Sequence, residues 1–245
     1  MKKTDILVFC GVLACLAPFL IFPEFYGAYK LVNAQHPLSM AFLKFAVLAT
    51  FGEVLGLRIK SGYYNAPGFG ILPRAIVWGV LGVWMAAAMG FYRAGVPTWL
   101  SGFPAFAEMK TAMSGGFSGM KLCASFMISL LINVSFAPIF MVLHKITDAH
   151  IAHCGGSLRF LVTPIDMADQ LARLNWQVQW DFVFRKTIPR FWIPAHTITF
   201  ILPGDFQVLF AALLGIALGL ILSLAAIRSR ACTPLIQGNK HTPFK

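Results

Sequence analysis

Long apolar runs separated by short polar connections occupy most of the chain. A helix that crosses a membrane needs about 20 mostly apolar residues, because each residue rises 1.5 Å through a hydrocarbon core about 30 Å thick. The runs of this kind are Ile6–Phe22, Leu38–Leu57, Ala75–Tyr92, Phe117–Leu143 and Phe206–Ile227. A further run, Phe191–Leu202, is apolar but shorter, with Pro194 near its start and Pro203 directly after it. We interpret it as a half-helix or a short, tilted crossing.

These runs predict an all-α fold: an integral membrane helical bundle of five to six transmembrane helices, one of them short and flanked by prolines. Composition agrees, since 58% of the 245 residues are hydrophobic and 12% are charged, against about 25% charged in soluble domains. We expect a single transmembrane domain over 1–245, with an extra N-terminal helix in 1–34, the bundle in 35–230 and a polar tail in 231–245. The first run is interpreted as an uncleaved helix, and removal as a signal peptide is the alternative.

Positive charge is concentrated in the connections. The chain carries 20 Lys and Arg against 9 Asp and Glu, but the basic residues form no dense patch, so nucleic acid is not an expected partner. Connections rich in Lys and Arg usually stay in the cytoplasm. Six crossings would place every basic connection on one side, which predicts cytoplasmic termini and an external segment 95–116. The expected partner is the lipid bilayer, and a homo-oligomer is left open.

Small residues recur at every fourth position in two of the runs. Such stripes allow two helices to approach closely, which compensates for the missing hydrophobic drive between helices in lipid. The expected helix-packing residues are Gly82, Ala86 and Gly90 in the third run and Ala211, Gly215, Gly219 and Ser223 in the last.

A polar stripe distinguishes the fourth run. Lys121, Ser125, Ser129 and Asn133 recur at every fourth position, and Pro138 follows them. Polar groups inside a membrane face protein or water, because lipid offers no hydrogen bonds. Proline also leaves a carbonyl one turn back without its amide partner. The stripe therefore predicts either hydrogen bonds to neighbouring helices or a polar lumen.

Two charged residues interrupt the second run. Lys44 is expected to extend its ammonium group toward the near interface. Glu53 is one turn from Arg58, which offers it a partner near the membrane boundary.

Candidate metal ligands gather after the fourth run, where His144, His150, His153 and Cys154 surround Asp148. His150 and His153 could share a helix face and bind a metal, but nothing fixes four ligands, so a solvated loop is the preferred interpretation. The sequence has no nucleophile elbow, zinc-protease, phosphate-loop or dinucleotide motif. We therefore expect no enzyme activity, no cofactor and no metal.

The C-terminal third resembles a known family. The Mpv-seventeen and PMP-twenty-two membrane proteins of peroxisomes and mitochondria carry a pattern W-P-x-x-Q-x-x-N-F-x-x-V-P before their last helix. Trp192 and Phe200 match it at the right separation, while His196 stands at the glutamine and Thr199 at the asparagine. The family's arginine after the signature is absent, with Gln207 near its place. Weaker similarities follow in the family's order: Gln35-His36-Pro37, Gly52-Glu53, Gly90-Phe91-Tyr92, and Phe136-Ala137-Pro138 with Asn133 before it.

The resemblance implies an all-helical membrane protein of a family whose members are proposed to form channels for small solutes. Together with the polar stripe it predicts channel-like or pore-like passage of small solutes. The alternative is a membrane structural or interaction protein without transport activity. The Met-Lys-Lys start without an Arg-rich transit peptide favours a multi-pass protein of the bacterial inner membrane. The residues expected to line the pore or polar interior are Lys121, Ser125, Ser129, Asn133, Pro138, Trp192, His196 and Thr199.

Overall fold

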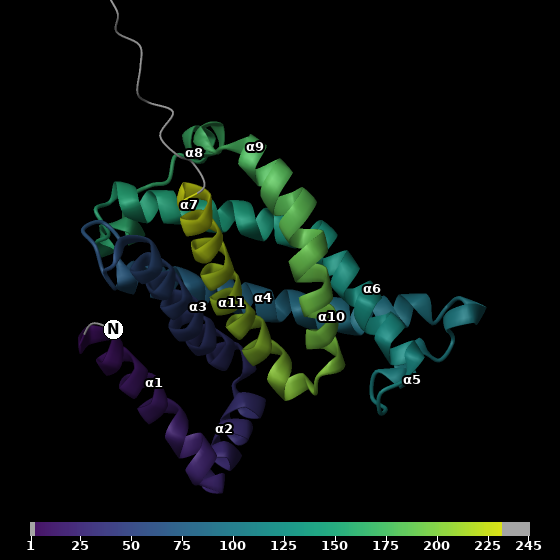
Figure 1. The fold of residues 1–245 in the computed structure, drawn as a ribbon. Coiled ribbons are helices and arrows are strands. Elements are labelled where there is room, and N and C mark those ends of the chain that lie inside the picture. The colour runs from purple at the N-terminus through teal and green to yellow at the C-terminus, as the bar shows by residue number, and fades with distance from the viewer. Residues whose placement is uncertain (1–2, 232–245) are drawn as a thin grey trace, which may run out of the picture.

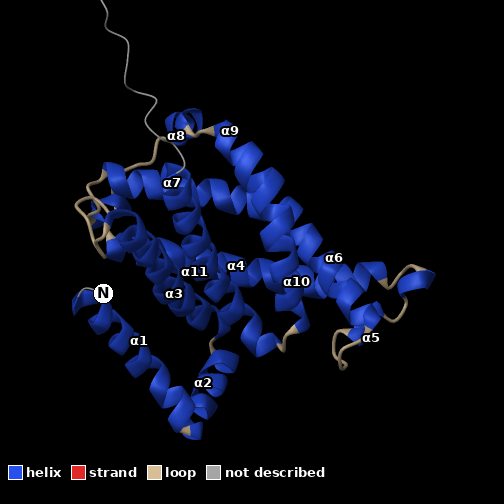
Figure 2. Cartoon of the chain, viewed as in Figure 1, coloured by secondary structure: helices blue, strands red, loops and turns tan. Residues whose placement is uncertain are grey.

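The computed structural model describes residues 3–231, and within them the chain consists of helices joined by turns and loops, with no strand (Figures 1 and 2). The longer helices are α1 (Lys3–Ile21), α2 (Pro23–Gln35), α3 (Pro37–Ser61), α4 (Ile71–Leu100), α6 (Gly119–Ser135), α7 (Ala137–His153), the π-helix η3 (Gln179–Trp192), α10 (Ile193–Ile201) and α11 (Gly204–Ala231). The short ones are η1 (Pro104–Phe106), α5 (Met109–Ala112), η2 (Leu158–Leu161), α8 (Met167–Arg173) and α9 (Trp176–Val178). The predicted polar tail, apart from residue 231, lies outside the described residues.

Two of the described helices, α3 and α4, are each long and apolar enough to cross a membrane. The pairs α1–α2 and α6–α7 also qualify if each bent pair is one crossing, with bends of 86° and 46°. The described part of the chain thus offers two to four crossings, fewer than the five to six expected. In α11 the described apolar stretch, Gly204–Ala217, is shorter than a crossing requires.

The fourth predicted run is two helices rather than one. Helix α6 ends at Ser135 and α7 begins at Ala137. Pro138 occupies the second position of α7, where its missing N–H costs nothing, whereas its ring obstructs a continuous helix through this point. The short run near the C-terminus is also not isolated, because η3 leads directly into α10.

Close contact of α3 with α4 and α11 depends on glycine. A Cβ atom at Gly82 would lie 2.4 Å from the Cβ of Phe45 on α3, and one at Gly52 would lie 2.9 Å from the Cα of Ile216 on α11. Both positions therefore exclude any side chain. Gly82 and the buried Ala211 belong to the predicted packing stripes, while Gly52 does not.

Other members of the stripes are placed differently. Among the described residues an added Cβ would meet nothing within 4 Å at either Gly90 or Gly215, so neither makes the close helix contact expected from the pattern. Gly90 is exposed and Ala86 is half-buried. Gly219 and Ser223 lie outside the residues whose side-chain surroundings are described.

Helices α1 and α2 form a V beside the bundle (Figure 1). A charged contact closes its open end: Arg58 of α3 donates to both carboxylate oxygens of Asp5 at 2.8 and 2.9 Å, and the Tyr64 hydroxyl donates at 2.9 Å. The predicted pairing of Arg58 with Glu53 is therefore wrong. Lys44 is buried and donates to the side chain of Asn33 on α2; its expected reach to the membrane interface stays a prediction.

Candidate functional site

A cavity of about 410 Å³ lies among α3, α4, α6, α7, η3, α10 and α11. Its size is within the range of small-molecule sites, and its wall is mainly apolar, as theirs are. The polar and charged side chains on the wall come from six different helices. They are Glu53, Lys60, Arg74, Trp78, Asn133, His144, Lys145, Asp148, Gln179, Thr187, Trp192 and His196.

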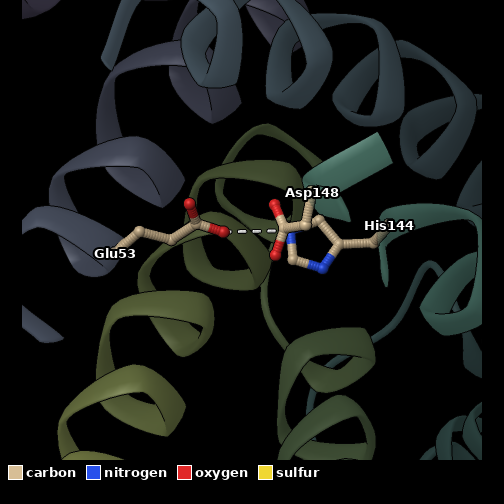
Figure 3. Close-up of side chains that lie close together, drawn as sticks. All are labelled: Glu53, His144 and Asp148. Atoms are coloured by element: carbon tan, nitrogen blue, oxygen red, sulfur yellow. Dashed lines mark hydrogen bonds and ion pairs between the residues drawn. The ribbon is translucent and has the colours of Figure 1, made fainter. Parts of the chain in front are cut away.

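A charged cluster joins three helices at the cavity wall. The Nη1 atom of Arg74 on α4 lies 2.5 Å from Oε2 of Glu53 on α3 and 2.5 Å from Oδ1 of Asp148 on α7. Glu53 Oε1 accepts from the Trp78 indole at 3.0 Å and lies 2.9 Å from Nε2 of His144, the contact drawn in Figure 3. The His144 ring also packs on Trp78, with centroids 4.3 Å apart. Every charge in the cluster therefore has an opposite charge or a hydrogen bond.

The cluster also has the composition of a metal site. Ligand atoms of Glu53, His144 and Asp148 all lie within 4.8 Å of one another, and carboxylate and imidazole groups are common metal ligands. The guanidinium of Arg74, however, contacts both carboxylates and supplies the positive charge that a metal would bring. We therefore interpret the cluster as a compensated ion network rather than a metal centre.

The histidines predicted to lie in a solvated loop are instead on α7. His144 faces the ion network, and the buried His150 ring lies 3.2 Å from the carbonyl oxygen of Phe160. His153 is exposed at the end of the helix. The predicted metal alternative at His150 and His153 has no support from this arrangement.

A second polar group joins α6 to α10. The Asn133 Nδ2 atom donates to the Ser129 carbonyl at 2.8 Å and lies 3.0 Å from Nδ1 of His196. The Ser129 hydroxyl donates to the Ile193 carbonyl at 2.7 Å. Trp192 covers His196, with ring centroids 5.1 Å apart. The stripe of α6 and the C-terminal segment thus meet at Asn133 and His196.

Three buried polar atoms on residues of the cavity wall have no partner in the described part of the chain. They are Oδ1 of Asn133, Oε1 of Gln179 and Nε1 of Trp192. Unpartnered buried polar groups are costly and rare in folded proteins. All three residues line the same cavity, which makes this cavity the candidate site.

The other residues expected in a polar interior are not on the wall. Lys121 starts α6 and donates to the Gly115 carbonyl at 2.8 Å. Thr199 is fully buried and donates to Ala195 of its own helix at 2.9 Å. Ser125 is buried, and its hydroxyl has no partner among residues 3–231 as far as they are described. Pro138 stands in the first turn of α7. Like Ser129, these four residues do not line the cavity, and their place in a polar interior stays a prediction.

The ion network and Gln179 were not predicted from the sequence. Both ion pairs of Arg74 join separate helices, and Arg74 lies 21 and 74 positions from its two partners along the chain. The usable signal was the spacing of His144 and Asp148, which puts both on one face once the segment is taken as a helix.

The contact between Asn133 and His196 involves two of the positions on which the resemblance to the Mpv-seventeen and PMP-twenty-two family rests. That resemblance remains a prediction from the residues. Comparison of the chain with protein-family models, with curated proteins and with solved structures finds no match.

Proposed function

We propose that this protein is a multi-pass membrane protein whose cavity passes small solutes, in the channel-like manner expected from the sequence. The supporting observation is the cavity itself: about 410 Å³, with unpartnered polar atoms of Asn133, Gln179 and Trp192 on residues of its wall. In a helical bundle with no passage we would expect side chains to fill a volume of this size, because voids cost packing energy.

The cavity extends along the bundle rather than forming a local defect. Asn133 and His144 are eleven positions apart on the bent pair α6–α7, which corresponds to roughly 16 Å of helix. Both line the same cavity. A space of that length covers about half of a hydrocarbon core about 30 Å thick.

For the membrane arrangement we propose that α3, α4 and the pair α6–α7 cross the bilayer, with α1–α2 and the segment from η3 to α11 completing five to six crossings. The distribution of Lys and Arg supports cytoplasmic termini and an external 95–116. The bacterial inner membrane stays the favoured location. The family resemblance belongs to the same proposal.

The test is solute flux in liposomes with a variant that fills the cavity. Gly215 lines the cavity, and an added Cβ there meets no described atom within 4 Å. Gly215→Leu should therefore fold normally, place its side chain in the cavity and reduce flux severalfold. Gly90→Leu is the matched control, because Gly90 is also helical and open but does not line the cavity.

Three results distinguish the alternatives. Flux above that of empty liposomes, lowered by Gly215→Leu and unchanged by Gly90→Leu, supports passage through this cavity. If both variants lowered solute flux equally, the flux would not pass through this cavity. Wild-type flux equal to that of empty liposomes, over anions, cations and neutral solutes, would reject passage and favour the structural or interaction protein.

A further inference from the structure

The helix η3 has two different faces. Backbone bonds of a π-helix join residues five positions apart, so residues four or five positions apart lie on the same side. Gln179 and Val183 follow this spacing and line the cavity. Arg185, Lys186 and Arg190 follow it as well, and all three are exposed. One face of η3 therefore closes the cavity, while the other carries a basic stripe formed by Arg185, Lys186 and Arg190.

The basic stripe carries an excess of positive charge. The only acidic residue of η3 is Asp181, whose carboxylate lies 3.7 Å from Nη1 of Arg185. Both side chains are largely exposed, 48% for Asp181 and 73% for Arg185, and exposed pairs contribute little. Lys186 and Arg190 form no salt bridge with any residue that the structure describes. Three cations therefore face outward against one carboxylate.

The position of the stripe along the chain is that of a membrane boundary. Helix η3, between the labels α9 and α10 in Figure 1, leads directly into α10, which belongs to the proposed crossings. Trp180, before the stripe, is 64% exposed, and Ile198 on α10, after it, is 53% exposed. Tryptophan is enriched at membrane interfaces. The proposed topology places the start of η3 on the cytoplasmic side, where anionic lipids attract basic segments next to a crossing.

From the charge and the position of the stripe we infer that Arg185, Lys186 and Arg190 bind the headgroup of an anionic phospholipid at the cytoplasmic surface of the membrane. An Arg guanidinium pairs with two phosphate oxygens at once, and Lys adds a point charge. A zwitterionic lipid carries its own ammonium group beside the phosphate and is attracted less. The inference rests on the proposed membrane placement and is independent of the proposed passage of solutes.

The test compares two lipids on the purified full-length protein in a neutral detergent. Phosphatidylglycerol and phosphatidylcholine are titrated separately, and bound lipid is counted by native mass spectrometry. Wild type should prefer phosphatidylglycerol, and the preference should fall as salt is added. Each of Arg185→Gln, Lys186→Gln and Arg190→Gln should lower the affinity for phosphatidylglycerol roughly 5-fold at low salt and leave that for phosphatidylcholine unchanged.

Two further variants separate charge from folding. Arg185→Lys with Arg190→Lys keeps all three positive charges and should retain most of the preference. A control for total charge replaces three exposed cations outside η3 by glutamine, namely Lys110, Arg159 and Arg173, and should lower the preference less than the triple glutamine variant of η3 does. Because the stripe is exposed, the η3 variants should keep the melting temperature of wild type.

The contrary outcomes are distinct. Equal binding of both lipids by wild type, or equal loss of preference in the η3 and control variants, would overturn the lipid site and leave the passage of solutes standing. Displacement of the bound lipid by millimolar inorganic phosphate would show that the stripe binds free phosphate, which also overturns the lipid site. Extraction of the protein from cell membranes by buffer without detergent would overturn the membrane placement itself.

Discussion

Arg74 is the only Lys or Arg whose side chain contacts both Glu53 and Asp148 in the described part of the chain. Replacing it by methionine in Arg74→Met keeps an unbranched apolar stem and removes the charge. Two carboxylates from different helices then remain close together, with His144 beside them. We expect the contacts among α3, α4 and α7 to weaken, because the variant leaves negative charge buried without its partner.

The magnitude follows from the burial of the three side chains. Removing one member of a buried ion pair costs about 3–5 kcal/mol. The side chains of Arg74, Glu53 and Asp148 are 11%, 19% and 22% exposed, so some water reaches them and the lower end, about 3 kcal/mol, applies. In a chain of this size each kcal/mol shifts the melting temperature by about 2–4 °C, which gives a decrease of about 6–12 °C.

The assay is thermal unfolding of the purified protein in detergent. Lys145→Met is the control, since Lys145 is mostly exposed and 3.9 Å from Asp148, and surface pairs contribute about 0–1 kcal/mol. The double variant Glu53→Gln with Arg74→Met should melt several degrees above Arg74→Met, because it removes one of the two unpaired charges. A melting temperature for Arg74→Met within 2 °C of wild type, or no recovery in the double variant, would refute the reasoning about the network.

Two further predictions concern the N-terminal V and the orientation. Asp5→Asn should loosen the link of α1 to Arg58 and Tyr64, and limited proteolysis should then cut faster between α1 and α2. Equal cleavage rates would mean that this contact does not hold α1. Thr98→Cys, in a variant without the native cysteines, should react with an impermeant reagent added to whole cells; reaction only after permeabilisation would invert the proposed topology.

The pattern of apolar residues predicted most of the long helices correctly. A long apolar run marks a single segment that is buried or faces lipid, and the length of the run gives the length of the helix. It missed α2 and most of η3, where aromatic and charged residues are mixed. Arg185, Lys186 and Arg190 interrupt every apolar run in η3, so no window reaches the hydropathy of a crossing. For this reason we expected the short apolar segment before α11 to begin only at Phe191, near the end of η3.

The partner of Glu53 could not be found by proximity in sequence. Residues that face each other on a helix are three or four positions apart, and Arg58 is five positions from Glu53. At 3.6 residues per turn it therefore points to a face about 140° away. That rotation brings Arg58 to Asp5 of α1 and leaves Glu53 facing α4 and α7. Such pairings depend on which helices become neighbours, and a single sequence does not contain that information.

The bend at Pro138 explains why one cavity contains both a compensated ion network and unpartnered neutral atoms. Asn133 lies in the last turn of α6, and His144 lies on α7 beyond a turn of 46°. A straight helix would carry the two residues along one line, whereas the bend directs α7 toward Glu53 and Arg74 while α6 stays packed on α10 through Asn133. The ion network needs no occupant, because its charges satisfy one another. At the Asn133 end an amide oxygen is buried without a partner among the described residues, so the bend separates a charged part of the wall that satisfies itself from a neutral part that does not.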